Sequence, residues 1–236
     1  MSKFEIINNE EGQPTKGYVR GATLCYIKLQ DGALKYGSKT EKEYVLDAVV
    51  DKATAKAWKK MFSKNTPKEV DTEEFEAKYK ITPPFPDEDE QYVIKFKAKA
   101  QFTKEMSVNG PDGVVVHEEG SLIPYEWNTR PKLFVKGSEG VKDVTMTILA
   151  ANGSVGDVAF NISSNDFGTF PKLTGVLVTD LIEYESQGGG ANASPFGEIE
   201  GGLNAGDGNM KQVATPQEDS GEAGDNNPPF DSDIDF

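Results

Sequence analysis

The chain has one cysteine and one histidine in 236 residues, Cys25 and His117. A single cysteine cannot form a disulfide within the chain, and such sparse use is typical of a reducing compartment. No stretch approaches the roughly 20 apolar residues that span a bilayer. The N-terminus, Met1 to Glu5, lacks the basic and apolar pattern of a signal peptide. We therefore expect a cytoplasmic protein that does not interact with membranes.

Motifs for catalysis or metal binding are also missing. A catalytic triad could use only His117 as its base, no G-x-S-x-G elbow precedes a helix, and there is no P-loop. One histidine and one cysteine cannot form a zinc cluster. The acidic run 87–90 is typical of a solvated loop, and Asp231, Asp233 and Asp235 lack the further ligands and glycine of a calcium loop. The sequence predicts no enzyme, no cofactor and no metal site.

The charge is unevenly distributed along the chain. The formal net charge is −14, and residues 187–236 contribute −9 of it, with ten Asp or Glu and a single lysine. This segment also holds ten glycines and few large apolar groups, too few to offset the entropy of ordering. We expect a folded domain at 1–186 and a disordered acidic tail at 187–236. The body is close to balanced, so any polyanion site on it requires locally concentrated basic groups.

The pattern of the body predicts an all-β core with a helical insertion. A capping box at Thr40 to Glu43 and a 3.6-residue apolar period predict a helix to about Lys64, and a shorter helix is expected after Asp71, which places the insertion at about 40–80. From Gln91 onward the pattern is that of strands. Five to eight strands of this kind form a barrel or a sandwich. The strand candidates are 18–29, 91–103, 114–117, 122–128, 132–135, 141–149, 155–162 and 173–184.

The first candidate for chemistry is a strand in which lysines alternate with apolar residues. Lys95, Lys97 and Lys99 share one face of it, roughly 6.6 Å apart per pair, a spacing similar to the phosphate repeat of an extended single strand of nucleic acid. The alternative is an ordinary half-buried strand whose lysines are simply solvated.

The second candidate is the run Pro124-Tyr-Glu-Trp-Asn128. Interpreted as a strand, it places Tyr125 and Trp127 on the same side, where two rings would form a stacking platform worth about 1–3 kcal/mol per base. Arg130 and Lys132 follow and could contact phosphates. The alternative is that both rings belong to the core. Basic groups and aromatic rings together on a small β core favour single-strand binding.

These residues resemble a known family, the single-stranded DNA-binding proteins of tailed bacteriophages, which have an OB-fold and an acidic C-terminal tail. Three stretches carry the resemblance in the same order: Tyr92 to Phe102, where Phe and Lys alternate; Ser121 to Thr129, similar to the family's S-L-V-P-Y-x-W-N-T run; and the acidic end, Asp231 to Phe236. Residues 1–40 and the Thr82 to Pro86 connection match the family poorly.

The resemblance implies an OB-fold barrel that binds single-stranded DNA without sequence preference in replication, recombination or repair, in the host cytoplasm. It implies base stacking by Tyr125 and Trp127 and phosphate contacts by Lys95 and Lys97, whereas the role of Lys99 rests on geometry. It also implies that the tail recruits replication proteins such as the DNA polymerase and the helicase-primase. The tail residues expected to contact protein are Asp231, Asp233, Ile234, Asp235 and Phe236.

Two other classes of function are compatible with parts of the sequence. A DNA mimic that inhibits host nucleic-acid enzymes would explain the net charge of −14, but the acidic excess lies in the tail rather than on a folded surface. A β-sandwich of the virion would explain the strand pattern, but the chain has no repeats and no coiled coil, and the acidic end would have no role there.

Overall fold

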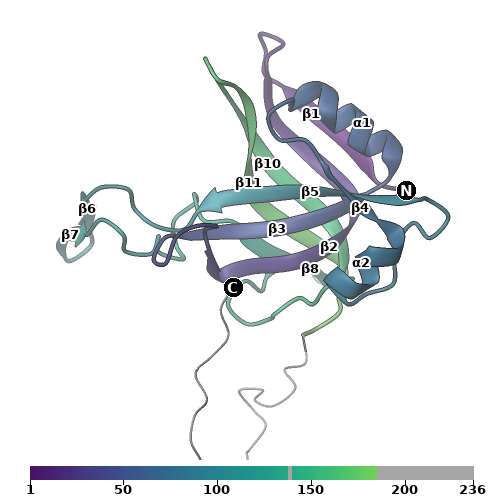
Figure 1. Cartoon of the computed structure of the whole chain (residues 1–236). Helices are drawn as coiled ribbons and strands as arrows, with labels where there is room; N and C mark the ends of the chain where they lie inside the picture. The colour runs from purple at the N-terminus through teal and green to yellow at the C-terminus, as the bar shows by residue number, and fades with distance from the viewer. Residues whose placement is uncertain (138–139, 185–236) are drawn as a thin grey trace, which may run out of the picture. The chain divides into compact units, whose positions relative to one another are not determined.

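The computed structural model describes residues 1–137 and 140–184 (Figure 1). The expectations for the tail at 187–236 therefore lie outside the described residues. The elements, in chain order, are β1 (Lys3–Asn8), β2 (Pro14–Leu34), β3 (Lys42–Val50), α1 (Lys52–Met61), β4 (Lys68–Asp71), α2 (Thr72–Tyr79), β5 (Glu90–Lys99), β6 (Met106–Gly110), β7 (Gly113–His117), β8 (Lys132–Gly137), β9 (Gly140–Asp143), β10 (Val155–Asn165) and β11 (Gly168–Asp180).

One large sheet forms the body of the fold. Its hydrogen-bonded order is β4-β5-β3-β2-β10-β11-β8-β9, and β1 pairs with the first part of β2. All neighbours are antiparallel except β8 and β11, which are parallel. The sheet curls until β11 lies beside β5, although no ladder joins these two strands in the described part of the chain. The fold is therefore all-β and OB-like, as the sequence predicts, with the barrel left open.

The 21-residue strand β2 connects the two halves of this sheet. Residues before Thr23 pair with β1 and β10, and residues from Thr23 onward pair with β3. Past Thr23 the only strand paired with β2 is β3, within the residues that the structure describes. The other side of β2 is consequently left for contacts with loops.

The core fills the inside of the curled sheet. Trp58 of α1 lies against Phe62, Phe96 and Phe160, with ring centroids 4.4–5.2 Å apart, and all four side chains are buried. Helix α1 begins where the Asp51 carboxylate accepts a hydrogen bond from the Thr54 amide, 2.8 Å away. Burying each large side chain contributes about 1.5–3 kcal/mol. This helix therefore covers the core on the inner side of the sheet.

The sequence prediction of a helix over 40–64 is partly wrong. Residues 42–50 form β3, and the helix spans only Lys52–Met61. The reason is that β3 is buried on both faces: Leu46 and Val50 face the main core, whereas Val49 packs under α2 in a second cluster with Phe75. A strand with two buried faces shows no alternation, so its apolar residues also fit a helical period. The shorter helix expected after Asp71 is confirmed as α2.

Two strand predictions are also corrected. Residues 122–128 form turns, apart from a single bridge between Leu122 and Gln101. The strand expected over 141–149 ends at Asp143 and continues as a turn. The remaining candidates overlap observed strands.

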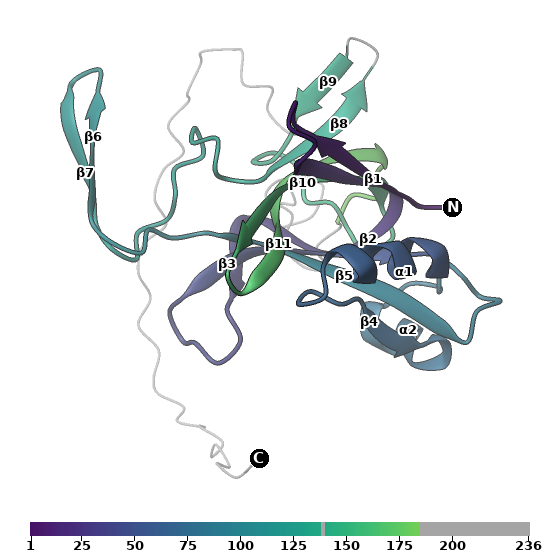
Figure 2. The same cartoon turned by 90° about the horizontal axis from the view of Figure 1, so that it is seen from above.

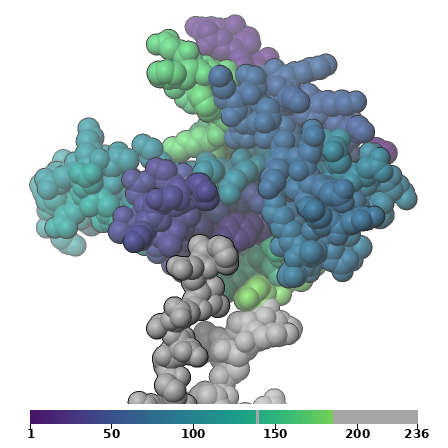
Figure 3. All heavy atoms as spheres, viewed as in Figure 1, coloured from purple at the N-terminus to yellow at the C-terminus, as the bar shows by residue number. Residues whose placement is uncertain are grey.

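Strands β6 and β7 form a separate two-stranded hairpin, which stands away from the other strands in both views (Figures 1 and 2). Its base is held where His117 stacks on Phe102, with ring centroids 4.9 Å apart. In the space-filling view, the segment with α1, β4 and α2 (blue) lies on the side opposite the hairpin (Figure 3). This segment, residues 52–79, is called the insertion below. Among the described residues, no helix is long and apolar enough to cross a membrane.

Candidate nucleic-acid interface

The lysines of β5 lie on one exposed face, as predicted. Ile94, Phe96 and Ala98 are buried in the core, whereas the alternating residues Lys95, Lys97 and Lys99 are exposed. A strand side chain repeats its direction every second residue, so the three ammonium groups leave the sheet on its outer side. The strand therefore presents an outward row of three positive charges.

A fourth lysine joins this row from β2. Lys97 pairs with Val45 of β3, and Val45 pairs with Lys28 of β2. Residues directly opposite one another in a sheet point to the same face, and Lys28 is exposed. The four lysines Lys28, Lys95, Lys97 and Lys99 are called the lysine face below.

Most of this charge is not neutralised by ion pairs. The Lys97 ammonium lies 2.8 Å from the Glu43 carboxylate, and these side chains are 48% and 22% exposed. Lys28, Lys95 and Lys99 have no carboxylate within 4 Å in the described part of the chain. An exposed pair such as Lys97–Glu43 contributes little, about 0–1 kcal/mol, so an anion can displace it.

Tyr26 is an exposed ring beside the lysine face that the sequence interpretation missed. It lies where the pairing of β2 with β3 shifts between Cys25 and Lys28, and its φ of 52° is unusual for a residue other than glycine. The Tyr26 amide donates to the Asn152 side-chain oxygen, 2.7 Å away. The ring is 49% exposed, with the Lys28 ammonium 5.9 Å from its centroid.

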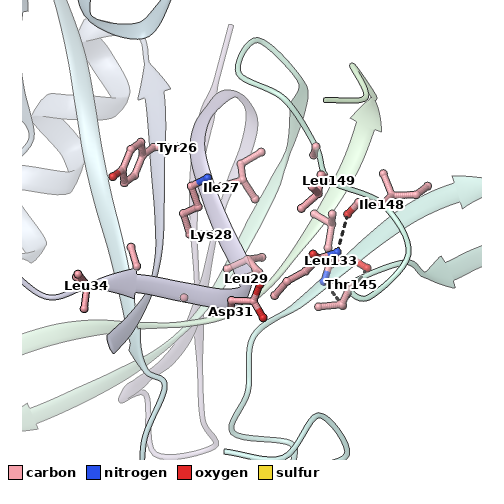
Figure 4. Close-up of a pocket in the computed structure, with 14 residues that line it drawn as sticks. Tyr26, Ile27, Lys28, Leu29, Asp31, Leu34, Leu133, Thr145, Ile148 and Leu149 are labelled. Carbon is pink, nitrogen blue, oxygen red and sulfur yellow. Dashed lines mark hydrogen bonds between the residues drawn. The ribbon is translucent and has the colours of Figure 1, made fainter. Parts of the chain in front are cut away.

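A groove runs along the side of β2 on which the described part of the chain places no strand (Figure 4). It encloses about 540 Å³ between the second half of β2 and the 145–150 segment, with Tyr26 and Lys28 on the β2 side and Leu133 and Ile148 opposite. Its opposite wall is fixed where the Leu133 amide donates to Thr145 Oγ1 at 2.8 Å. An apolar groove next to an exposed ring and an ammonium group can receive flat, partly apolar groups such as bases.

The stacking platform expected from Tyr125 and Trp127 does not have the predicted geometry. The segment folds into two successive turns, in which the Trp127 amide donates to the Pro124 carbonyl and the Arg130 amide to the Trp127 carbonyl, each at 3.1 Å. Side chains two residues apart point to the same side only in a β-strand, so the turns give Tyr125 and Trp127 no common face. Trp127 lies edge-on to Phe102 and His117, with centroids 5.2 and 5.5 Å apart. Both rings are half-buried.

Arg130, expected to contact phosphate, lies in the interior and is 7% exposed. Its guanidinium donates to the main-chain oxygens of Leu29 and Gln30 and lies 5.1 Å from the centroid of the Tyr44 ring. These contacts join the turn segment to β2. The arginine therefore supports the fold from inside and does not present its charge to solvent.

Lys132 is half-buried between two partners. Its ammonium lies 4.6 Å from the centroid of the Tyr125 ring and 3.6 Å from the Asp143 carboxylate. The neighbouring Asp143 carboxylate raises the pKa of the Tyr125 hydroxyl. The structure thus groups Tyr125 with Lys132 and Asp143, and places the lysine face on a different part of the sheet.

The protein-contacting residues expected in the tail, from Asp231 to Phe236, lie outside the described residues. No group of three or more His, Cys, Asp or Glu that could hold a metal ion occurs within 1–137 and 140–184.

Comparison with known proteins returns solved structures and no sequence match. Neither a protein-family model nor a curated protein sequence matches the chain. The structure is similar to the single-stranded DNA-binding protein of bacteriophage Enc34 (TM-score 0.38, 13% identity, covering 80% of this chain and 97% of that chain). It is also similar to the Enc34 protein in complex with ssDNA (0.35, 15%, 77% and 97%) and to gp2.5, the single-stranded DNA-binding protein of bacteriophage T7 (0.37, 15%, 87% and 100%).

These structures come from the group of proteins that the sequence resembles. All three are single-stranded DNA-binding proteins of bacteriophages.

Proposed function

We propose that the protein binds single-stranded DNA without sequence preference along the lysine face. The observation that carries the proposal is the row of exposed lysines on the outer side of β5, extended across β3 by Lys28. Ammonium groups at a spacing of roughly 6.6 Å match successive phosphates of an extended strand. The lysines would contact only the phosphates of the DNA, so these contacts do not select a base sequence.

The same surface favours a single strand over a duplex. Tyr26 and the adjoining groove offer a ring and an apolar wall within reach of the lysines, and stacking requires bases that are free of pairing. Every base has a face that can stack, so this contact is tolerant of sequence as well. In this proposal the phosphates lie on the lysines and the bases turn toward Tyr26.

The proposal assigns different roles to the two parts of the chain. Residues 1–186 bind DNA and protect replication and recombination intermediates, and residues 187–236 recruit replication proteins through Asp231, Asp233, Ile234, Asp235 and Phe236. Support for the second role comes from sequence alone: a segment with ten Asp or Glu and one lysine that ends in alternating carboxylates, isoleucine and phenylalanine. Truncation after residue 186 is expected to abolish co-purification with a replication partner and to leave a folded DNA-binding domain.

The test of DNA binding replaces Lys95, Lys97 and Lys99 with alanine and measures the affinity for a fluorescent dT oligomer by anisotropy at several salt concentrations. Each phosphate contact contributes about 0.7 to the slope of log K against log salt, so the slope should fall by about 2. At 0.1 M salt that corresponds to a loss of affinity of roughly 30–100-fold. The thermal melting curve should stay close to that of the wild type, because all three side chains are exposed.

The matched control removes the same charge from the other side of the sheet. Lys56, Lys59 and Lys60 are exposed on α1, which covers the core on the inner face. The Lys56→Ala, Lys59→Ala, Lys60→Ala variant should keep nearly the full salt slope. An equal loss in both triple variants, or no loss in the lysine-face variant, would overturn the proposal.

A further inference from the structure

Two more lysines approach the lysine face from the insertion. Lys68 of β4 pairs with Val93 of β5, and Val93 points to the same side as Lys95 two residues later. Helix α2 packs over Val93 through Phe75 and Tyr79, which brings Lys78 to the same place. Lys68, Lys78 and Lys95 are all exposed and come from three different elements.

The three lysines surround one carboxylate, Asp47 of β3, which pairs directly with Lys95. Asp47 Oδ2 accepts a hydrogen bond from the Tyr79 hydroxyl at 3.2 Å, and Cys25 of β2 is paired with it from the other side. The second oxygen, Oδ1, is buried without a hydrogen-bond partner in the described part of the chain. The groups facing Asp47 are therefore one phenol, one thiol and three ammonium groups, from every element packed around it.

This cluster holds more positive charge than its single carboxylate balances. Burial lowers the pKa of Lys78, and the neighbouring ammonium groups of Lys68 and Lys95 lower it further. Burial also raises the pKa of Asp47, against the opposing effects of Lys95, Tyr79, Lys78 and Lys68. With Asp47 ionised the cluster carries a net charge of +2, which an anion placed among the ammonium groups would offset.

We propose that Lys68, Lys78 and Lys95 form a discrete site for one backbone phosphate of single-stranded DNA, and that Asp47 beneath them limits its affinity. This inference rests on the proposed function and adds α2 and β4 to the path of the strand, which then runs from Lys99 along β5 to the insertion. Asp47 competes with the phosphate for the same ammonium groups, so its protonation tightens binding.

The first experiment replaces Lys68 and Lys78 with alanine and leaves the β5 lysines in place. The salt slope for a dT oligomer should fall by up to about 0.7, the contribution of the one phosphate that these side chains help to bind. The charge-matched control is Lys56→Ala, Lys60→Ala on α1, for which little change is expected. If the insertion variant keeps the slope of this control, the phosphate site is overturned.

The result separates this inference from the proposed function. Loss of slope in the Lys95, Lys97, Lys99 triple variant together with an intact slope in the Lys68, Lys78 variant would remove the phosphate site and leave DNA binding on the lysine face. No loss in either variant would remove both. Inorganic phosphate, compared with chloride at equal ionic strength, should compete with the oligomer more strongly for wild type than for the Lys68, Lys78 variant.

The second experiment tests Asp47 through the pH dependence of binding. Wild-type affinity should rise as the pH falls from 7 to 4.5, since protonating Asp47 removes the charge that competes with phosphate. Asp47→Asn should bind about threefold more tightly at pH 7 and low salt, because the substitution removes one negative charge close to the phosphate. It should also have a flatter pH profile than the wild type.

A melting curve checks that Asp47→Asn is folded. A folded variant that binds more weakly, or that keeps the wild-type pH profile, would overturn the role of Asp47. Should the variant fail to fold, the wild-type titration alone decides, because an affinity that does not rise on acidification contradicts the same claim.

Discussion

The lysines of β5 and Arg130 are both cations next to the core, but the fold uses their charges in opposite ways. Lys95 and Lys99 stand on a strand whose main chain is already paired, so their ammonium groups are not needed as donors to the main chain of β5. Arg130 instead supplies hydrogen bonds to carbonyl groups in the half of β2 that, among the described residues, pairs with β3 on one side and with no strand on the other. A cation can bind a ligand only where it is exposed and its hydrogen-bond donors are not used by the protein itself.

The largest expected effect concerns the buried member of this comparison. Arg130→Met should lower the free energy of unfolding by about 2–4 kcal/mol, because it leaves the carbonyl oxygens of Leu29 and Gln30 without their donor. Urea unfolding measures this change. The folded fraction should bind the dT oligomer as the wild type does. A stable variant with weakened binding would show instead that Arg130 contacts phosphate, and would break the comparison.

An intermediate effect is expected at Tyr26, the ring next to the exposed cations. Tyr26→Asn removes the ring but keeps a residue that tolerates the left-handed backbone. Affinity for the oligomer should fall by about 1–3 kcal/mol if the ring stacks on a base. Tyr26→Phe keeps the stacking surface and should bind nearly as well as the wild type. Equal affinities of the Asn and Phe variants would mean that no base contacts this ring.

The smallest effect is expected where Tyr125 and Lys132 meet Asp143. Tyr125→Phe should cost only about 0.5 kcal/mol of stability, since these groups are partly solvated. Burial raises the pKa of Asp143, but the neighbouring Tyr125 hydroxyl and the hydrogen bonds from Thr145 outweigh it and the pKa is lowered.

The sign of the pH effect at Asp143 follows from that lowered pKa. Its stabilising contribution is present above its unfolded pKa of about 4 and is lost as the pH falls through the folded value. Tyr125→Phe should therefore lose less stability than wild type on acidification. Melting temperatures between pH 6 and pH 2 compare the two proteins, and parallel curves would exclude the interaction between Tyr125 and Asp143 as the cause.

The sequence predicts those parts of the site that depend on local alternation. From Ile94 onward, strand β5 has one face in the core and one in solvent, so Lys95, Lys97 and Lys99 could be assigned to a common surface from the sequence. The same logic fails for β3, whose outer face is covered by α2 and whose residues are apolar on both sides. The prediction from alternation fails again at Tyr125 and Trp127, because these alternating aromatic residues lie in turns and not in a strand.

Tyr26 and Lys28 could not have been assigned to the candidate interface from their neighbours in sequence. The shift in pairing that exposes Tyr26 is fixed by Asn152, which is 126 residues away, and Lys28 is placed beside Lys97 only through an intervening strand. The same holds for Lys68 and Lys78, which meet Lys95 because the insertion folds back over β5. Residues brought together by such long-range pairing leave no local pattern.

The length of β2 has a consequence for how the chain folds. The first half of β2 forms its ladder with β10, which lies far along the chain. The ion pair between Arg20 and Asp157, 2.9 Å long, joins residues that are 137 positions apart. Closing so long a loop has an entropic cost that must be met before the pairing stabilises anything. High contact order of this kind slows folding to roughly milliseconds to seconds. We therefore expect the pairing of β10 with β2, rather than the formation of either helix, to limit the rate at which the sheet folds.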